Sequence, residues 1–292
     1  MVKNHRLTAR VLHLGMVFSL LLLVGACSST TFIYNRLDII LPWYLNDYVD
    51  LNREQKTSLD NWLKPFFHWH RVEELPRYVQ ILSEIERGLD QTVSAEMVGR
   101  TFSEIEQAGL RLEDEALVWI FKLGDELSDE QILEFLTVLQ EQQEEYEEEY
   151  LDRSADEYLE DSYDNFVDSL QDYLGRLDKD QRTALRNASA ELMRMDALWL
   201  QERAKWLANL NILLRREPDW QRELRELKAA REDNYSPQYR EAYAHNLVVI
   251  QGAIATVIDN RSDKQDKRLR KKLQSLREDF DTLIAQADSI QQ

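Results

Sequence analysis

Glycine, proline and cysteine are scarce in this sequence of 292 residues, which has 8 Gly, 5 Pro and 1 Cys. β-Sandwiches and barrels need many tight turns, and nucleotide-binding folds need glycine-rich loops that hold phosphate. These counts therefore argue against an all-β fold and against a nucleotide-binding fold. With one cysteine, the chain forms no internal disulfide and no cysteine-based zinc site. Because 43% of the residues are hydrophobic, we still expect a folded protein with a buried core.

The first 26 residues have the layout of a secretory signal peptide. Three basic residues within 1–10 precede a mostly apolar stretch over 11–24, which is too short to span a membrane alone. The sequence LVGAC follows at 23–27. Small residues followed directly by Cys resemble the bacterial lipobox, which implies cleavage before Cys27 and lipidation of its thiol through a thioether, with acyl chains such as palmitate. The alternative is an ordinary signal peptide followed by a cysteine by chance.

We predict three parts: a lipoprotein signal peptide over 1–26, a lipidated tether over 27–31 and a single helical periplasmic domain over 32–292. The residue after the acylated cysteine is Ser28. In lipoprotein sorting, Asp at this position retains a protein in the inner membrane. Ser28 therefore favours the bacterial outer membrane, with the domain lipid-anchored on the periplasmic side.

The chain is strongly acidic, with 54 Asp and Glu against 36 Lys and Arg and a formal net charge of −18. Residues 1–26 hold three basic residues and no acidic residue, so their removal would bring the charge to −21. Such a protein is repelled by nucleic acid and by anionic headgroups. We therefore expect no nucleic-acid partner, and we expect membrane attachment through the N-terminal acyl chains.

Four segments share a helix-start pattern in which Asn, Ser or Asp is followed three residues later by Gln. This is a capping box, in which the first side chain and the Gln satisfy each other's backbone N–H groups. The intervals between these starts, 76, 50 and 84 residues, are too irregular for a solenoid and indicate helical hairpins of different lengths. The four segments are LNREQ at 51–55, LSDEQ at 127–131, LDKDQ at 177–181 and RSDKQ at 261–265.

Apolar residues recur at spacings of three and four through most of the chain, which predicts helices that pack along one another with coiled-coil-like seams. The clearest seam runs from Leu269 to Ile290, and a stretch over 178–215 contains neither Gly nor Pro. The predicted fold is therefore all-α, an elongated bundle of long antiparallel helical hairpins. The predicted helices are 31–49, 52–72, 75–88, 94–122, 128–152, 155–175, 178–215, 218–232, 237–259 and 262–290, with Pro65 and Pro76 interrupting the region of the second.

The sequence contains no pattern that is typical of an active site. His68 and His70 are two residues apart, so on a helix their rings point about 200° apart and do not meet one metal ion. The chain has no zinc-protease motif, no phosphate-binding loop and no nucleophile motif. We therefore expect no enzyme activity, no cofactor and no metal site.

The segment WLKPFFHWHRVEELP at 62–76 combines large rings with polar and charged tips. We interpret it as a candidate partner surface, and the alternative is a packed corner of the core. The candidate residues are Trp62, His68, Trp69, His70, Arg71 and Glu74.

Two further segments leave two readings open. Glu141–Glu149 contains six Glu and forms either a site for a basic partner or loosely held cation, or a solvated face with Tyr146 and Tyr150 pointing inward. The aromatic stretch over 32–48 either rests on the membrane near the lipid anchor or packs as the first helix of the bundle. Its aspartates favour packing.

The lipobox and several later segments resemble a proteobacterial lipoprotein family known as domain of unknown function 6279. The resemblance implies an envelope lipoprotein over essentially the whole mature chain and supplies no activity. Separately, the Leu-x-x-x-Gln starts are similar to motifs of small periplasmic stress chaperones, which are helical cradles. The segments that carry the first resemblance are YNRLD at 34–38, WYL at 43–45, YVDL at 48–51 with Gln55, WHR at 69–71 and ELP at 74–76 with Tyr78.

We therefore predict a non-enzymatic envelope lipoprotein that binds an unidentified envelope protein in a chaperone-like or assembly role. A structural periplasmic spacer is the first alternative, and an enzyme with an acidic cleft is the second. The oligomeric state stays open.

Overall fold

The structure, a computed structural model, describes residues 29–289, and this part of the chain is all-α without a strand. The predicted fold class is confirmed. The signal peptide and Cys27 lie outside the described residues. Residues 29–31, which we assigned to the tether, already belong to the first described helix.

The helices keep the short connections that the sequence predicts. Their bounds are α2 Ser29–Tyr34, α3 Leu37–Leu45, α4 Arg53–Trp69, the π-helix η1 His70–Glu74, α5 Leu75–Gly88, α6 Ala95–Glu126, α7 Asp129–Leu151, α8 Ala155–Leu174, α9 Lys179–Glu191, α10 Asp196–Leu213, α11 Trp220–Ala229, α12 Pro237–Asp259 and α13 Asp263–Ser289.

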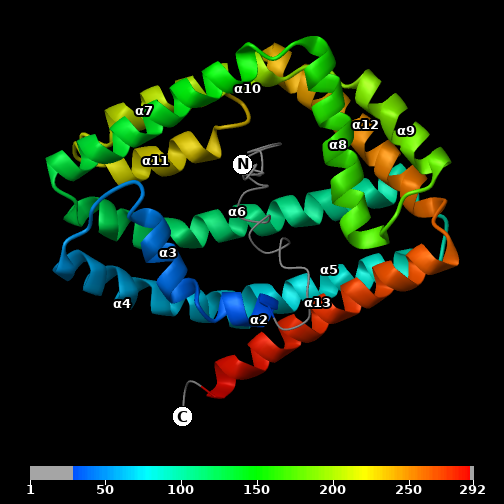
Figure 1. Cartoon of the computed structure of the whole chain (residues 1–292). Coiled ribbons are helices and arrows are strands. Elements are labelled where there is room, and N and C mark those ends of the chain that lie inside the picture. The colour runs from blue at the N-terminus through cyan, green and yellow to red at the C-terminus, as the bar shows by residue number, and fades with distance from the viewer. Residues whose placement is uncertain (1–28, 290–292) are drawn as a thin grey trace, which may run out of the picture.

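The helices are arranged around an oval outline (Figure 1). At the bottom, α4, η1 and α5 form one continuous rod, and α13 packs along α5. At the top, α7 pairs with α10, and α8, α9 and α12 close one side. Helix α6 returns antiparallel to the rod, packing against α4 with one part and against α12 with another. Most of the extensive helix pairs therefore join helices that are distant in the sequence, such as α5 with α13 and α6 with α12, whereas α8 and α9 are consecutive helices that pack together.

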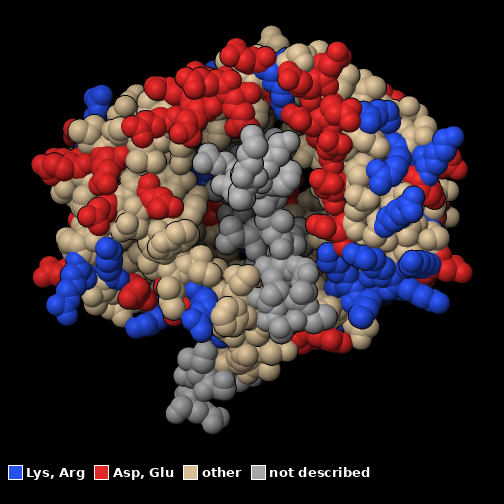
Figure 2. Space-filling model, in the orientation of Figure 1, with Lys and Arg blue, Asp and Glu red and all other residues tan. Residues whose placement is uncertain are grey.

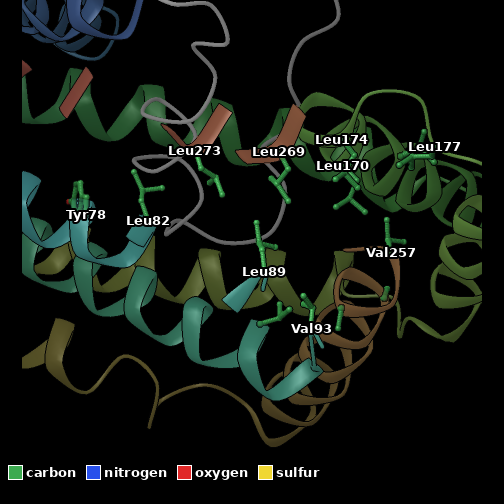
Figure 3. Close-up of a cluster of buried hydrophobic side chains, with 14 of the residues drawn as sticks. Tyr78, Leu82, Leu89, Val93, Leu170, Leu174, Leu177, Val257, Leu269 and Leu273 are labelled. Atoms are coloured by element: carbon green, nitrogen blue, oxygen red, sulfur yellow. The ribbon is translucent and has the colours of Figure 1, made fainter. Parts of the chain in front are cut away.

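Two hydrophobic cores lie at the two ends of this outline. The first is built from α5, α8, α9, α12 and α13, and it includes the predicted seam residues Leu269 and Leu273 (Figure 3). The second is built mainly from α4, α6, α7, α10 and α11. Helix α6 bridges them, because Ala108 belongs to the first core and Trp119 to the second.

The four predicted helix starts are confirmed, and in the structure they form two pairs. The side-chain amides of Gln55 and Gln131 donate to each other, at 2.8 and 2.9 Å. Those of Gln181 and Gln265 do the same, at 3.2 and 2.9 Å. The two pairs lie at opposite ends of the molecule, where α4 and α7 begin and where α9 and α13 begin (Figure 1). Each glutamine therefore caps its own helix and also joins two helix starts that are 76 or 84 residues apart.

The predicted helix over 178–215 is wrong as a single helix, because α9 and α10 are separated by a break at 192–195. Other helices satisfy the backbone groups at the break. Asn246 of α12 accepts from the Met193 N–H and donates to the Met193 carbonyl, both at 2.8 Å. Tyr158 of α8 also donates to that carbonyl. These side chains replace the hydrogen bonds that a continuous helix would make.

Three other predicted boundaries differ. The helix predicted over 31–49 is divided into α2 and α3, and the one predicted over 218–232 is shortened to α11. Pro65 does not interrupt the helix, since α4 continues through Pro65 to Trp69.

Candidate functional site

The predicted partner surface lies at the end of α4, through η1 and into α5, but the structure does not place its residues on one face. Two of them are buried, His70 and Glu74. The others are half-buried or exposed: Trp62, Trp69 and Arg71 are half-buried, and His68 is exposed. The segment is therefore mainly a packed polar corner, which we call the polar corner, defined by residues 70–78.

A π-helical turn shapes the polar corner. The Leu75 N–H donates to the His70 carbonyl five residues earlier, instead of four. Pro76 follows directly. Proline has no N–H to donate, and its ring clashes with the carbonyl four residues earlier, so it would disturb a regular α-helix at this point. The wider turn lets the rod continue past the proline. It also places His70 and Glu74 on the inner side of the rod, where both are buried.

Glu74 is fully buried and is held by two arginines. It accepts from Arg111 Nε at 2.7 Å and Arg111 Nη2 at 2.9 Å, and from Arg77 Nη1 at 2.5 Å. The hydrogen bond to Glu74 raises the pKa of Arg111 above its ordinary value. A bidentate arginine–carboxylate pair fixes geometry as well as charge, so this pair locks α6 to the rod.

His70 connects the polar corner to the N-terminal segment. Its Nδ1 lies 2.7 Å from the hydroxyl of Tyr34, which belongs to α2 and is buried. Burial lowers the pKa of His70 to about 4 and raises that of Tyr34. The imidazole is therefore neutral at neutral pH, and the protonated tyrosine hydroxyl can donate to it.

Further contacts hold α2 in the same place. Arg71 donates to Asn35 at 2.7 Å and lies over the Tyr34 ring, 5.1 Å from its centroid. Thr31 donates to Asp279 of α13 at 3.0 Å. The partner that the polar corner contacts in this structure is thus the chain's own N-terminal segment.

Sequence reasoning identified the polar corner but missed its partners. Tyr34 was recognised as part of the aromatic stretch near the anchor, without any link to His70. Arg111 was not singled out. The available signal was its position next to Leu112 and three residues after Ala108, both buried, since a lone cation beside an apolar helix face requires a carboxylate partner.

The consecutive helices α7 and α8, which we call the acidic hairpin, are a second candidate; they are joined by a short connection, and α7 packs on α10 whereas α8 packs on α9 and α13. Residues 129–174 contain 17 Asp and Glu and a single basic residue, Arg153. The hairpin therefore carries a net charge of −16 out of −18 for the whole chain. Figure 2 shows acidic side chains gathered along the top of the molecule, where α7 and α8 meet.

Few of these carboxylates are compensated. Asp129, Glu160 and Asp161 form ion pairs with arginines, and among the residues that the structure describes the other fourteen have no ion pair. Along α8, Glu160, Asp164 and Asp168 follow one another at spacings of four. Burial raises the pKa of Asp164, and its two acidic neighbours raise it further.

The aromatic side chains of the acidic segment point inward, as one of the two readings expected. Tyr150 is buried and Tyr146 is half-buried. Both contact Trp199 of α10, with ring centroids 6.1 and 5.5 Å apart. The outer face of α7 keeps two exposed leucines, Leu133 and Leu151. They are five helical turns apart and therefore on the same side of the helix.

A basic surface balances the acidic hairpin on the other part of the molecule. Residues 261–277 contain eight Lys and Arg against two Asp. Figure 2 shows the basic side chains at the lower right, where α13 begins. The net charge of the chain conceals this local reversal of sign.

Residues 29–289 contain no group of three or more His, Cys, Asp or Glu side chains that is arranged to hold a metal ion. No helix there is both long enough and apolar enough to cross a bilayer.

These features define an all-α protein with a polar corner that holds the N-terminal segment and with an acidic hairpin. The chain belongs to DUF6279, a family of unknown function, whose model matches residues 47–240. The match contains the polar corner and the acidic hairpin but not α2, α3 or α13. It is shorter than the whole mature chain over which we expected the resemblance to extend. No curated protein and no solved structure matches the chain.

Proposed function

We propose that this protein is a lipid-anchored, non-enzymatic protein of the bacterial envelope that binds another protein. The outer face of the α7–α8 hairpin would be the binding surface, and the partner would carry positive charge. The observation that carries this proposal is the concentration of nearly all the net charge, −16 of −18, in one hairpin.

Electrostatic repulsion within the hairpin supports a binding role. Like charges four residues apart on a helix destabilise it by about 0.2–0.5 kcal/mol per pair. A helix that needs only to be soluble can intersperse charges of both signs. A cationic partner would relieve the repulsion and would be steered toward the hairpin. The exposed Leu133 and Leu151 on the same side of α7 would add apolar contacts, which a protein can use and a free cation cannot.

The two alternatives find less support. A periplasmic spacer does not account for charge concentrated on one hairpin. An enzyme with an acidic cleft needs carboxylates that converge, whereas these are spread along the outer faces of two helices. A chaperone-like role stays a prediction.

Neutralising the exposed face of α7 tests the proposal. In the triple variant Glu141→Gln, Glu144→Gln and Glu148→Gln, we expect capture of the partner from envelope membranes to be lost while the melting temperature stays within a few degrees. A photo-reactive residue in place of Leu133 should crosslink to the same partner, which shows that the contact is direct.

The matched control neutralises three exposed carboxylates elsewhere, with Glu73→Gln, Glu217→Gln and Glu241→Gln. This control changes the net charge equally and should keep the partner. If both triple variants keep the same partner, or if residue 133 crosslinks to nothing, the proposed binding face is refuted.

A further inference from the structure

The N-terminal helices leave a group of large apolar side chains in solvent. Phe32 is 59% exposed, Ile39 59% and Trp43 69%. In α3, which is mostly apolar, no residue is buried. Single exposed apolar residues are normal on protein surfaces, but three within twelve positions on two consecutive short helices are a concentration of apolar side chains that favours contact with a partner or a membrane.

We propose that α2 and α3 form a membrane-seating surface, in which Phe32, Ile39 and Trp43 insert into the interface of the phospholipid bilayer that holds the acyl chains. This inference rests on the lipid anchor of the proposed function and adds a defined orientation of the protein on the membrane. It concerns a different face from the acidic hairpin.

The position of the anchor supports this occupant. Cys27 precedes Ser29, the first residue of α2, by two residues, and two residues span at most about 7 Å. Helix α2 is fixed against the rest of the domain, because Tyr34 and Asn35 form hydrogen bonds with the polar corner. The acyl chains of Cys27 would therefore enter the bilayer beside α2. Any side chain exposed on this face of the protein then lies close to lipid.

The chemistry of the patch suits a membrane interface. Ile39 and Trp43 are four residues apart and lie on one side of α3. Tryptophan favours the headgroup level of a bilayer, where its ring is partly apolar and its N–H stays hydrated. Arg36 lies over the Phe32 ring, 4.9 Å from its centroid, and can contact lipid phosphate. Asp38 lies about 100° from Ile39 around the helix axis, so it does not have to enter the bilayer with it.

The charge distribution agrees with this orientation. Helix α2 packs on the C-terminal part of α13, where Thr31 donates to Asp279, and the basic stretch over 261–277 precedes this contact in the chain. The acidic hairpin lies on the opposite, upper part of the molecule (Figure 2). An anionic lipid surface would repel the acidic upper part more strongly than the rest of the molecule. The acidic face would then point away from the membrane, where a partner protein can reach it.

Single-cysteine labelling tests the seating surface on the full lipidated protein. Thioether lipidation consumes the thiol of Cys27, the chain's one cysteine, so a cysteine introduced elsewhere is the sole reactive thiol. An environment-sensitive fluorophore is attached in the variants Ile39→Cys and Trp43→Cys. The matched controls are Leu133→Cys and Val248→Cys, two exposed apolar positions outside the patch. Each protein is reconstituted into vesicles of phosphatidylethanolamine and phosphatidylglycerol with brominated acyl chains.

We expect fluorophores at 39 and 43 to shift toward an apolar emission spectrum and to be quenched severalfold more than those at 133 and 248. Equal quenching at all four positions overturns the proposal. Fluorophores at 39 and 43 that are shielded from water but not quenched by lipid also overturn it, because a second copy or another protein then covers the patch. Vesicle flotation distinguishes a failure of the lipid anchor from a failure of the seating surface. Wild-type protein that does not float with the vesicles refutes the lipid anchor. Protein that floats but has unquenched fluorophores at 39 and 43 refutes the seating surface alone.

Discussion

Replacing Glu74 by glutamine removes a fully buried charge on which two arginines converge. Glutamine has nearly the same shape, so the substitution leaves no cavity. Its amide group, however, presents N–H donors to the N–H donors of Arg111, and one side of the bidentate pair is lost. The rod and α6 would then be joined by a single hydrogen bond where two exist now.

The size of the effect follows from the burial of the three groups. Removing one partner of a buried ion pair costs about 3–5 kcal/mol. The side chains of Arg111 and Arg77 are 35% and 45% exposed, so water can solvate part of the charge that is left. We therefore expect Glu74→Gln to lower the free energy of unfolding by about 2–3 kcal/mol. For a chain of this size, the melting temperature should fall by roughly 4–12 °C.

Thermal unfolding followed by far-ultraviolet circular dichroism measures this effect. The adjacent Glu73 is exposed and provides the matched control, because Glu73→Gln makes the same chemical change in the same turn. The control should change the free energy of unfolding by less than about 0.5 kcal/mol. If both variants melt at the same temperature, the ion pairs of Glu74 contribute nothing to stability, and the description of the polar corner as a lock is refuted.

Two further predictions concern acid stability and the paired helix starts. Burial lowers the pKa of His70 from 6.5 to about 4, so the folded state binds fewer protons than the unfolded state between these values, and stability should fall as the pH drops from 6.5 to 4. In urea unfolding, His70→Asn should remove about 2–3 kcal/mol of this pH dependence. Gln181→Ala removes the side chain that accepts from the Asp178 N–H in the capping box, together with the hydrogen bonds to Gln265, and it should lower the free energy of unfolding by about 2 kcal/mol in the same assay.

A specific result would refute each of these two predictions. An unchanged pH dependence in His70→Asn would show that the imidazole is not held neutral by burial. For Gln181→Ala, the control is Asn187→Ala, an exposed position on the same helix. Equal unfolding curves for the two variants would show that the paired glutamines add no stability.

The helix starts show how far local sequence reaches. A capping box depends on residues three positions apart, so all four starts could be predicted from the sequence. The pairing of these helix starts could not be predicted, because Gln55 and Gln131 are 76 residues apart and neither segment contains a signal that identifies its partner. The same limit explains the break between α9 and α10. Its local sequence suits a helix, and the hydrogen bonds that open it come from Asn246 and Tyr158, both remote in the chain.

The candidate sites divide along the same line. The acidic run Glu141–Glu149 could be predicted from the sequence, since charge density and the inward side of Tyr146 and Tyr150 follow from composition and helical periodicity. Its continuation along α8 was not singled out. The polar corner was noticed for its unusual residues, but its contents could not be assigned to a surface or to the core. That choice depended on whether a buried partner existed for Glu74, and Arg111 lies 37 residues away.

The sequence by itself determined the helical class, the helix starts and the concentration of negative charge, because propensity, capping and charge are properties of neighbouring residues. Only the tertiary structure decided which helix starts meet and where a long helix breaks. It also decided that the polar corner holds α2, which carries Phe32 and is followed by α3 with Ile39 and Trp43. These outcomes depend on hydrogen bonds and ion pairs between residues 36 to 84 positions apart, which form only when the whole chain has packed.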